Sequence, residues 1–186
     1  SAKRDRSMKV IWTIGPATAG DWGAPRNVSE DWWNSAHTAP AWNPTGDYIA
    51  LVSGGDIGYV EVDEDGLMAS SWLNSNGSWI VEDSTNGHPA WSADGTQLAF
   101  NRGGSDKEIW MLDWDENDIG NVRNTARQLA DAAGSTDYQP TWSPDGAWVY
   151  YASDANATGV FDIWRTEDAP ENPVMSGNTT WDFDEN

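Results

Sequence analysis

The sequence predicts an all-β protein built from repeated four-stranded antiparallel units, and three copies of one stretch carry this prediction. The clearest copy, residues 140–151, reads as a strand, a tight turn of sequence Ser-Pro-Asp-Gly and a second strand rich in aromatic and β-branched residues. Residues 88–100 repeat it closely and residues 39–51 more loosely. The anchoring tryptophans, which lie 49 and 51 residues apart, are Trp42, Trp91 and Trp142. A period near 50 with four short strands per unit is that of a β-propeller blade.

Composition limits the classes of partner. The 186 residues carry a net charge of −20, from 30 acidic and 10 basic side chains. Such a surface repels nucleic acid and anionic lipid, so neither is an expected partner. The charge favours solubility in salty, halophilic surroundings over cation binding. The absence of Cys excludes disulfides and thiolate catalysis, while the 14 Trp residues suit packing between sheets.

The remaining strands follow the repeat in order. Residues 108–112 and 162–166 form the third strand of their units, and residues 8–14 match them, so the chain is expected to begin within a blade. The third strand of the first full blade is expected at residues 57–62 and its fourth strand within residues 67–80. The predicted division is a linker or tag-like tail at 1–7, a half blade at 8–37, blade one at 38–85, blade two at 86–136, blade three at 137–180 and the start of a further strand at 181–186.

About three and a half blades rarely close into a ring, because an open end exposes an apolar blade face and unpaired strand edges. The chain is therefore expected to be a partial propeller or half of a closed ring, with a small irregular domain whose ends are covered as the alternative. Closure would need another chain or the rest of its own propeller. No apolar run is long enough to span a bilayer, so no membrane insertion is expected.

The motifs carry a family resemblance. Residues 89–95 and 140–146, each followed by an Ile-Trp strand, resemble the TolB-type, WD-like propeller repeat. Residues 11–51 are similar to a variant of that repeat found in exported bacterial proteins. The resemblance implies a periplasmic or extracellular propeller of six to eight blades. It also implies a docking platform, an envelope domain or the non-catalytic lid of a serine peptidase.

Polar residues around the start of two first strands suggest a binding site. His88 precedes the proline of blade two, at the expected rim of the central channel. The polar funnel predicted there consists of Asn86, His88, Asp137, Tyr138 and Gln139. Turn capping and bonding of loop backbone are the simpler roles for these residue types.

An acidic stretch after the third strand of blade two resembles the beginning of a calcium loop. Its alternating oxygen ligands are Asp113, Asp115, Asn117 and Asp118. Asp118 stands where an EF-hand has glycine, and Asn124 stands where it has the closing glutamate. An acidic hairpin turn is the simpler reading, so no cofactor is expected, with calcium as the alternative.

Together these observations predict a non-enzymatic binding or scaffold module that presents a polar face to a protein or saccharide partner. No Gly-x-Ser-x-Gly elbow is present, and His37 and His88 are the only histidines. Two alternatives stay open. One is the gating propeller of a peptidase or other hydrolase whose catalytic part lies elsewhere, and the other is a structural subunit of a surface assembly.

Overall fold

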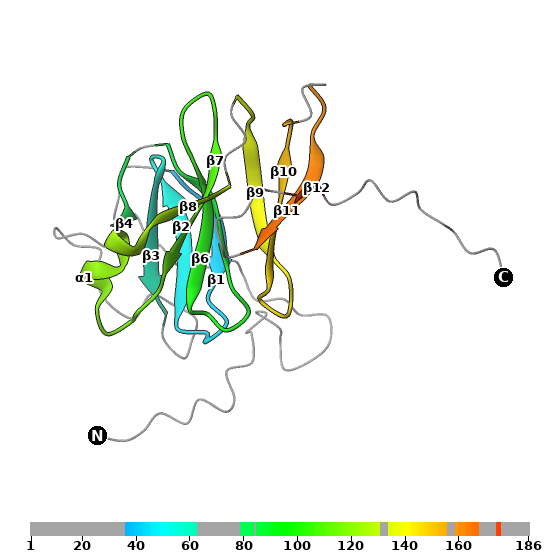
Figure 1. Ribbon diagram of the computed structural model, residues 1–186. Coiled ribbons are helices and arrows are strands. Elements are labelled where there is room, and N and C mark those ends of the chain that lie inside the picture. The colour runs from blue at the N-terminus through cyan, green and yellow to red at the C-terminus, as the bar shows by residue number, and fades with distance from the viewer. Residues whose placement is uncertain are drawn as a thin grey trace, which may run out of the picture.

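Three four-stranded antiparallel sheets stand side by side in the computed structural model (Figure 1). The structure describes residues 36–62, 79–83, 85–130, 134–155, 159–167 and 174–175. The tail, nearly all of the predicted half blade and the last predicted strand start lie outside these residues. Every sheet has its strands hydrogen-bonded in chain order, as propeller blades do. The predicted all-β fold of propeller blades is confirmed.

The strands of blade one are β1 (His37–Trp42), β2 (Tyr48–Ser53), β3 (Asp56–Glu61) and β4 (Trp79–Val81). Those of blade two are β5 (Gly87–Trp91), β6 (Gln97–Arg102), β7 (Glu108–Asp113) and β8 (Arg127–Ala130). Those of blade three are β9 (Asp137–Trp142), β10 (Trp148–Ser153), β11 (Asp162–Glu167) and β12 (Val174–Met175).

The turn between the first two strands is held by a serine and an aspartate in blades two and three. Ser92 Oγ donates to Asp94 Oδ1 at 2.7 Å, and Ser143 Oγ donates to Asp145 Oδ1 at 2.5 Å. Hydrogen bonds from Ser92, and then from the backbone and side chain of Thr96, lower the pKa of Asp94. The charged carboxylate therefore closes the turn at neutral pH.

Blade one closes the same turn differently, because it has asparagine in the serine position and threonine in the aspartate position. Asn43 Oδ1 accepts from the Thr45 N–H at 2.8 Å, and its Nδ2 donates to the Gly95 carbonyl at 3.2 Å. Asn43 is only 1% exposed. The departure from the repeat thus joins the turn of blade one to that of blade two.

The core lies between neighbouring sheets. Ala50, Val52 and Ile57 of blade one pack with Leu98 and Phe100 of blade two. A second cluster joins the other face of blade two to blade three. Its buried members are Ala99, Ile109, Met111, Leu129, Ala130, Val149 and Tyr151.

The same hydrogen bond crosses both seams between blades. The Trp91 indole N–H donates to the Ala41 carbonyl at 3.0 Å, and the Trp142 indole N–H donates to the Ala90 carbonyl at 3.0 Å. Trp91 and Trp142 therefore each fix their strand against the first strand of the preceding blade. This contact gives the repeated Pro-x-Trp motif its structural role.

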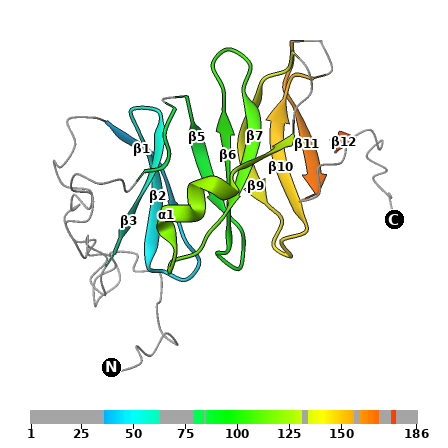
Figure 2. The same cartoon turned by 60° about the vertical axis from the view of Figure 1, so that its left-hand side comes forward.

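The connection from β7 to β8 is longer than the plain hairpin turn predicted for it. It contains the short helix α1 (Ile119–Val122) and the 3-10 turn η2 (Arg123–Thr125), which cross in front of the sheets in Figure 2. Val122 is 2% exposed and belongs to the core cluster between blades one and two. The helix thus brings an apolar side chain to the seam between these blades. Among the described residues, no helix has the length and apolar character needed to cross a membrane.

Candidate functional site

The residue before the proline has the same unusual backbone in all three first strands. Ala39, His88 and Gln139 have φ values of 49°, 48° and 54°. The pairing with the second strand shifts register at each of these places. Left-handed backbone is uncommon for residues other than glycine, and a bulge of this kind re-aims a side chain. His88 and Gln139 are both exposed.

His88 is held by a neighbour on the next strand. Its Nδ1 lies 2.8 Å from Asn101 Oδ1. Because that amide oxygen only accepts, Nδ1 carries the proton in this pair, and Nε2 is left as the acceptor of the neutral ring. A Cβ at Gly87 would lie 3.1 Å from Asn101 Nδ2. The glycine therefore makes room for the asparagine that orients His88.

Aromatic side chains extend this arrangement onto blade three. The Tyr138 ring lies edge-on to the His88 ring, with the ring centroids 6.4 Å apart. The centroid of the Phe161 ring lies 5.7 Å from that of Tyr138. Lys107 Nζ lies 5.8 Å from the centroid of the Tyr138 ring. We call His88, Asn101, Lys107, Tyr138 and Phe161 the end cluster. Its residues come from the strand ends and loops at one end of blades two and three.

Two residues of the predicted funnel are buried and hold loops in place. Asn86 is 6% exposed, its N–H donates to the Gly55 carbonyl at 2.7 Å, and its Nδ2 donates to the Val81 carbonyl at 3.4 Å. Asp137 is 1% exposed and accepts from Ser135 Oγ at 3.3 Å. The Asp137 N–H donates to the Lys107 carbonyl at 2.8 Å. Each residue thus attaches its blade to a loop of the blade before it.

The predicted funnel residues therefore divide into two groups. His88 and Tyr138 meet in the end cluster, and Gln139 is exposed at the bulge of the next blade. Asn86 and Asp137 are buried beside the same loops. Whether this end of the blades binds a ligand stays a prediction.

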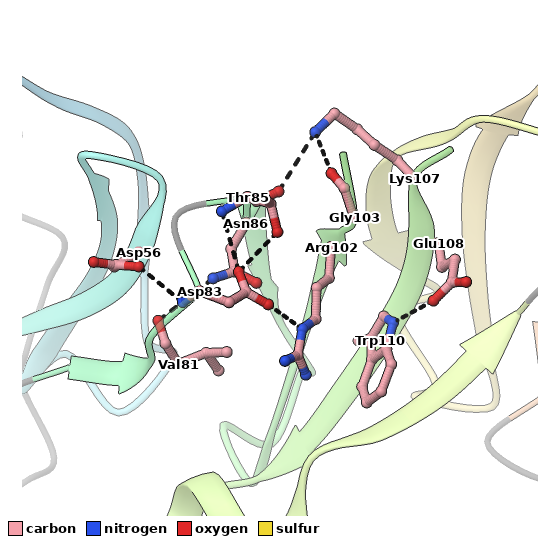
Figure 3. Close-up of polar contacts among 10 residues, drawn as sticks. All are labelled: Asp56, Val81, Asp83, Thr85, Asn86, Arg102, Gly103, Lys107, Glu108 and Trp110. Atoms are coloured by element: carbon pink, nitrogen blue, oxygen red, sulfur yellow. Dashed lines mark hydrogen bonds and ion pairs between the residues drawn. The ribbon is translucent and has the colours of Figure 1, made fainter. Parts of the chain in front are cut away.

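Lys107, Asn101 and Phe161 belong to the end cluster although the sequence analysis did not single them out. Lys107 Nζ donates to the carbonyls of Gly103 and Thr85, at 3.1 and 3.4 Å (Figure 3). Lys107 is one of only 10 basic residues in the chain, and that scarcity was the available signal. Asn101 and Phe161 follow no motif: Asn101 reaches the cluster on β6, and Phe161 reaches it from the loop just before β11.

An ion pair lies beside the end cluster, at the junction of blades one and two. Figure 3 shows Asp83, which follows β4, pairing with Arg102 on β6. The Arg102 guanidinium lies 4.5 Å from the Trp110 ring centroid, and the Trp110 indole donates to Glu108 at 2.9 Å. Burial acts to raise the pKa of Asp83, but hydrogen bonds from Thr85 and Arg102 outweigh it and lower the pKa. These polar groups satisfy one another and fix the junction.

The acidic loop predicted as a possible calcium site is bonded within the chain. Asp113 Oδ1 accepts from Arg127 at 3.1 Å, and Asp115 Oδ1 accepts from the Asn117 N–H at 2.9 Å. Asp118 Oδ2 accepts from Asn121 at 3.3 Å. In the part of the chain that the structure describes, no three His, Cys, Asp or Glu residues group as a metal site. Calcium binding here stays a prediction.

Solved structures similar to this chain are propeller proteins. TolB from Acinetobacter baumannii shares 21% identity and a TM-score of 0.53, over 76% of this chain and 32% of that chain. A puromycin hydrolase S511A mutant complexed with PGG is 18% identical with a TM-score of 0.55, and the match covers 76% of this chain and 23% of that chain. A nidogen/laminin complex contains a chain that is 11% identical with a TM-score of 0.50, and the match covers 76% of this chain and 48% of that chain. This chain therefore spans about a third of the TolB structure and less of the hydrolase.

No protein-family model matches the sequence, and comparison with curated proteins gives no match either. At these identities the similar structures establish the fold alone. That fold is the β-propeller, which the TolB-like repeat motif predicts. TolB and a hydrolase share this fold, so the comparisons do not choose between a binding module and an enzyme-associated module.

Proposed function

We propose that this propeller module is a non-enzymatic docking platform, and that the end cluster binds an extended segment of a partner protein. The observation that carries the proposal is the meeting of His88, Tyr138 and Phe161 across two blades. Phe161 and its neighbour Val160 are 47% and 60% exposed. Exposed aromatic and aliphatic groups beside oriented polar groups are typical of protein interfaces.

The chemistry of the cluster favours a peptide segment over a saccharide. Phe161 and Val160 offer apolar surface with no side-chain hydrogen-bonding group, which suits an apolar or aromatic side chain of the partner. His88 Nε2 offers one acceptor, which suits a backbone N–H or hydroxyl of the same segment. A saccharide needs several polar side chains around one aromatic ring to satisfy its hydroxyl groups. The proposed location is a periplasmic or extracellular compartment, in keeping with the resemblance to exported propellers.

A displayed library of random peptides, beside a panel of oligosaccharides, tests the proposal on the immobilised full chain at low salt. We expect peptide binding that Tyr138→Ala and Phe161→Ser each weaken by roughly 30-fold, as truncation of a central aromatic contact does. Ala93→Asp is the matched control, because Ala93 is exposed in the turn at the opposite end of the blade. Binding of oligosaccharides alone, or peptide binding indifferent to both cluster variants, would contradict the proposal.

A further inference from the structure

We propose that two copies of this chain associate through two blade faces. The face of blade three that carries Ile163 in one copy packs against the face of blade one that carries Ile49 in the other. The two seams inside the chain define what such an interface requires. At each seam a buried isoleucine on the third strand of one blade meets the next blade, whose tryptophan donates to a carbonyl of the first strand. Among the described residues, blade three has the equivalent isoleucine but no following blade to cover it. Blade one has the equivalent tryptophan but, in the part of the chain that the structure describes, no acceptor for its indole N–H.

The exposed isoleucine is on blade three. Ile57, Ile109 and Ile163 occupy the same place on their sheets, opposite Val52, Asn101 and Ala152. Ile57 and Ile109 are 0% exposed, whereas Ile163 is 54% exposed. The large apolar side chains that are exposed in the described residues all lie within 160–163 of this blade. Blade three thus presents the kind of face that the first two blades bury.

Blade one presents the opposite face. Ile49, Leu98 and Val149 are equivalent, because each pairs with the anchoring tryptophan of its blade. Leu98 and Val149 are 0% exposed, whereas Ile49 is only partly buried. Ile49 and Trp42 lie on the small cluster of Leu51, Val60 and Val62.

Within the described strands, the hydrogen bond between a tryptophan indole and a carbonyl of the preceding blade leaves one donor at blade one and one acceptor at blade three. Trp42 is the third anchoring tryptophan, and its indole has no acceptor among the described residues. Thr141, opposite Tyr150, has the ladder position of Ala41 and Ala90, whose carbonyls accept from the following tryptophan. A second copy supplies the Trp42 donor for the Thr141 carbonyl, and the first copy does the same in return. The three blades that the structure describes make six in two copies, and the half blades predicted at 8–37, which lie almost entirely outside the described residues, would make seven; both numbers are within the range of four to eight found in closed propellers.

Charge sets the conditions for this association. Each copy carries a net charge of −20, so two copies repel one another at low ionic strength. Arg165, stacked 4.1 Å from the Trp148 ring centroid on blade three, gives this face a positive charge that suits an acidic second copy. Added salt screens the long-range repulsion and leaves the apolar contact intact. The dimer should therefore strengthen with salt, unlike a complex held by opposite charges.

Light scattering and sedimentation equilibrium on the full chain, at low salt and at about 1 M salt where the screening length is about 3 Å, test the proposal. We expect a dimer at high salt with twice the 20.4 kDa mass of the chain. Ile163→Asp should abolish the dimer, while Ala93→Asp adds the same charge elsewhere and should keep it. Trp42→Phe should raise the dissociation constant about three- to tenfold, the effect of one lost hydrogen bond. A monomer at both salt concentrations, or a dimer that survives Ile163→Asp, would overturn the proposal.

The test is independent of the docking function. Ile163 is exposed, so its replacement leaves the core unchanged, and circular dichroism checks that each variant is folded. A monomer that still binds peptides through Tyr138 would overturn the interface and retain the docking site. A chain that dimerises at high salt but whose monomer binds no peptide at low salt would do the reverse.

Discussion

At the scale of the residue, the indole N–H of the anchoring tryptophan is the most informative group in the repeat. Trp91 and Trp142 are spaced one period apart, and each bonds to a carbonyl of the blade before it. The spacing of these residues was visible in the sequence, but the acceptor was not, because a carbonyl has no sequence signature. The turn and the tryptophan predicted the blade, and only the structure shows how one blade registers against the next.

Replacement of Trp142 by phenylalanine isolates this hydrogen bond. The ring stays in the seam, but the Ala90 carbonyl loses its donor, so we expect a loss of about 1–2 kcal/mol in the free energy of unfolding. Trp148→Phe is the control for ring size: the Trp148 indole donates to no acceptor in the described residues, and the phenylalanine ring keeps a face for Arg165, which stacks 4.1 Å from the Trp148 ring centroid. Urea unfolding at low salt measures both variants. Equal losses for the two would mean that ring size, and not the hydrogen bond, stabilises the seam.

Tyr48 gives the protein a sensitivity to alkali. Burial, and then the nearby charges of Glu116 and Glu61, raise its pKa to about 12. A raised pKa means that the folded state prefers the neutral phenol. The contribution of neutral Tyr48 to the free energy of unfolding is therefore complete below about pH 10 and is lost as the pH rises through 12. Tyr48→Phe should therefore lose less stability than the native chain between pH 9 and pH 12. Urea midpoints across that range check it, and parallel curves for the two proteins would refute it.

At the scale of the element, the turns and connections show where the repeat alone was insufficient. The four residues of β7–β8 sequence that form α1 include glycine and asparagine, which are poor helix formers. The helix exists because Val122 packs between two blades, a tertiary contact that no local pattern reveals. The left-handed backbone at His88 was hidden for a similar reason. A residue before proline is expected to be extended, and here the bulge overrides that preference.

The turn of blade one yields a prediction about contacts between turns. Asn43→Ser restores the residue found in the other blades but removes the bond to the Gly95 carbonyl, so we expect a loss of about 1 kcal/mol in unfolding free energy. The double variant Asn43→Ser/Thr45→Asp rebuilds the Ser–Asp turn within blade one. This double variant should recover the unfolding free energy that comes from the turn within blade one, but not the part that comes from the bond to the Gly95 carbonyl. Thermal or urea unfolding distinguishes the two, and full recovery in the double variant would show that the link between turns contributes nothing.

At the scale of the whole molecule, the four-stranded antiparallel sheets of a propeller followed from the sequence, because turn chemistry and strand periodicity recur at one spacing. The candidate site followed only in part. The sequence predicts His88 and Tyr138 for the site, whereas Lys107, Asn101 and Phe161 reach the end cluster through contacts between strands and between blades that no motif marks. The different exposure of Ile57, Ile109 and Ile163 was also beyond the sequence, since it depends on what each blade faces.

A tryptophan of one blade, bonded to the backbone of the blade before it, sets how neighbouring blades align. Hydrogen exchange of the indole N–H groups, followed by nuclear magnetic resonance at low salt, measures these bonds one by one. We expect the Trp91 and Trp142 indole protons to exchange only when the blades separate, while the Trp42 proton exchanges fast. Fast exchange at Trp91 and Trp142, at the rate shown by Trp42, would contradict this role of the tryptophans.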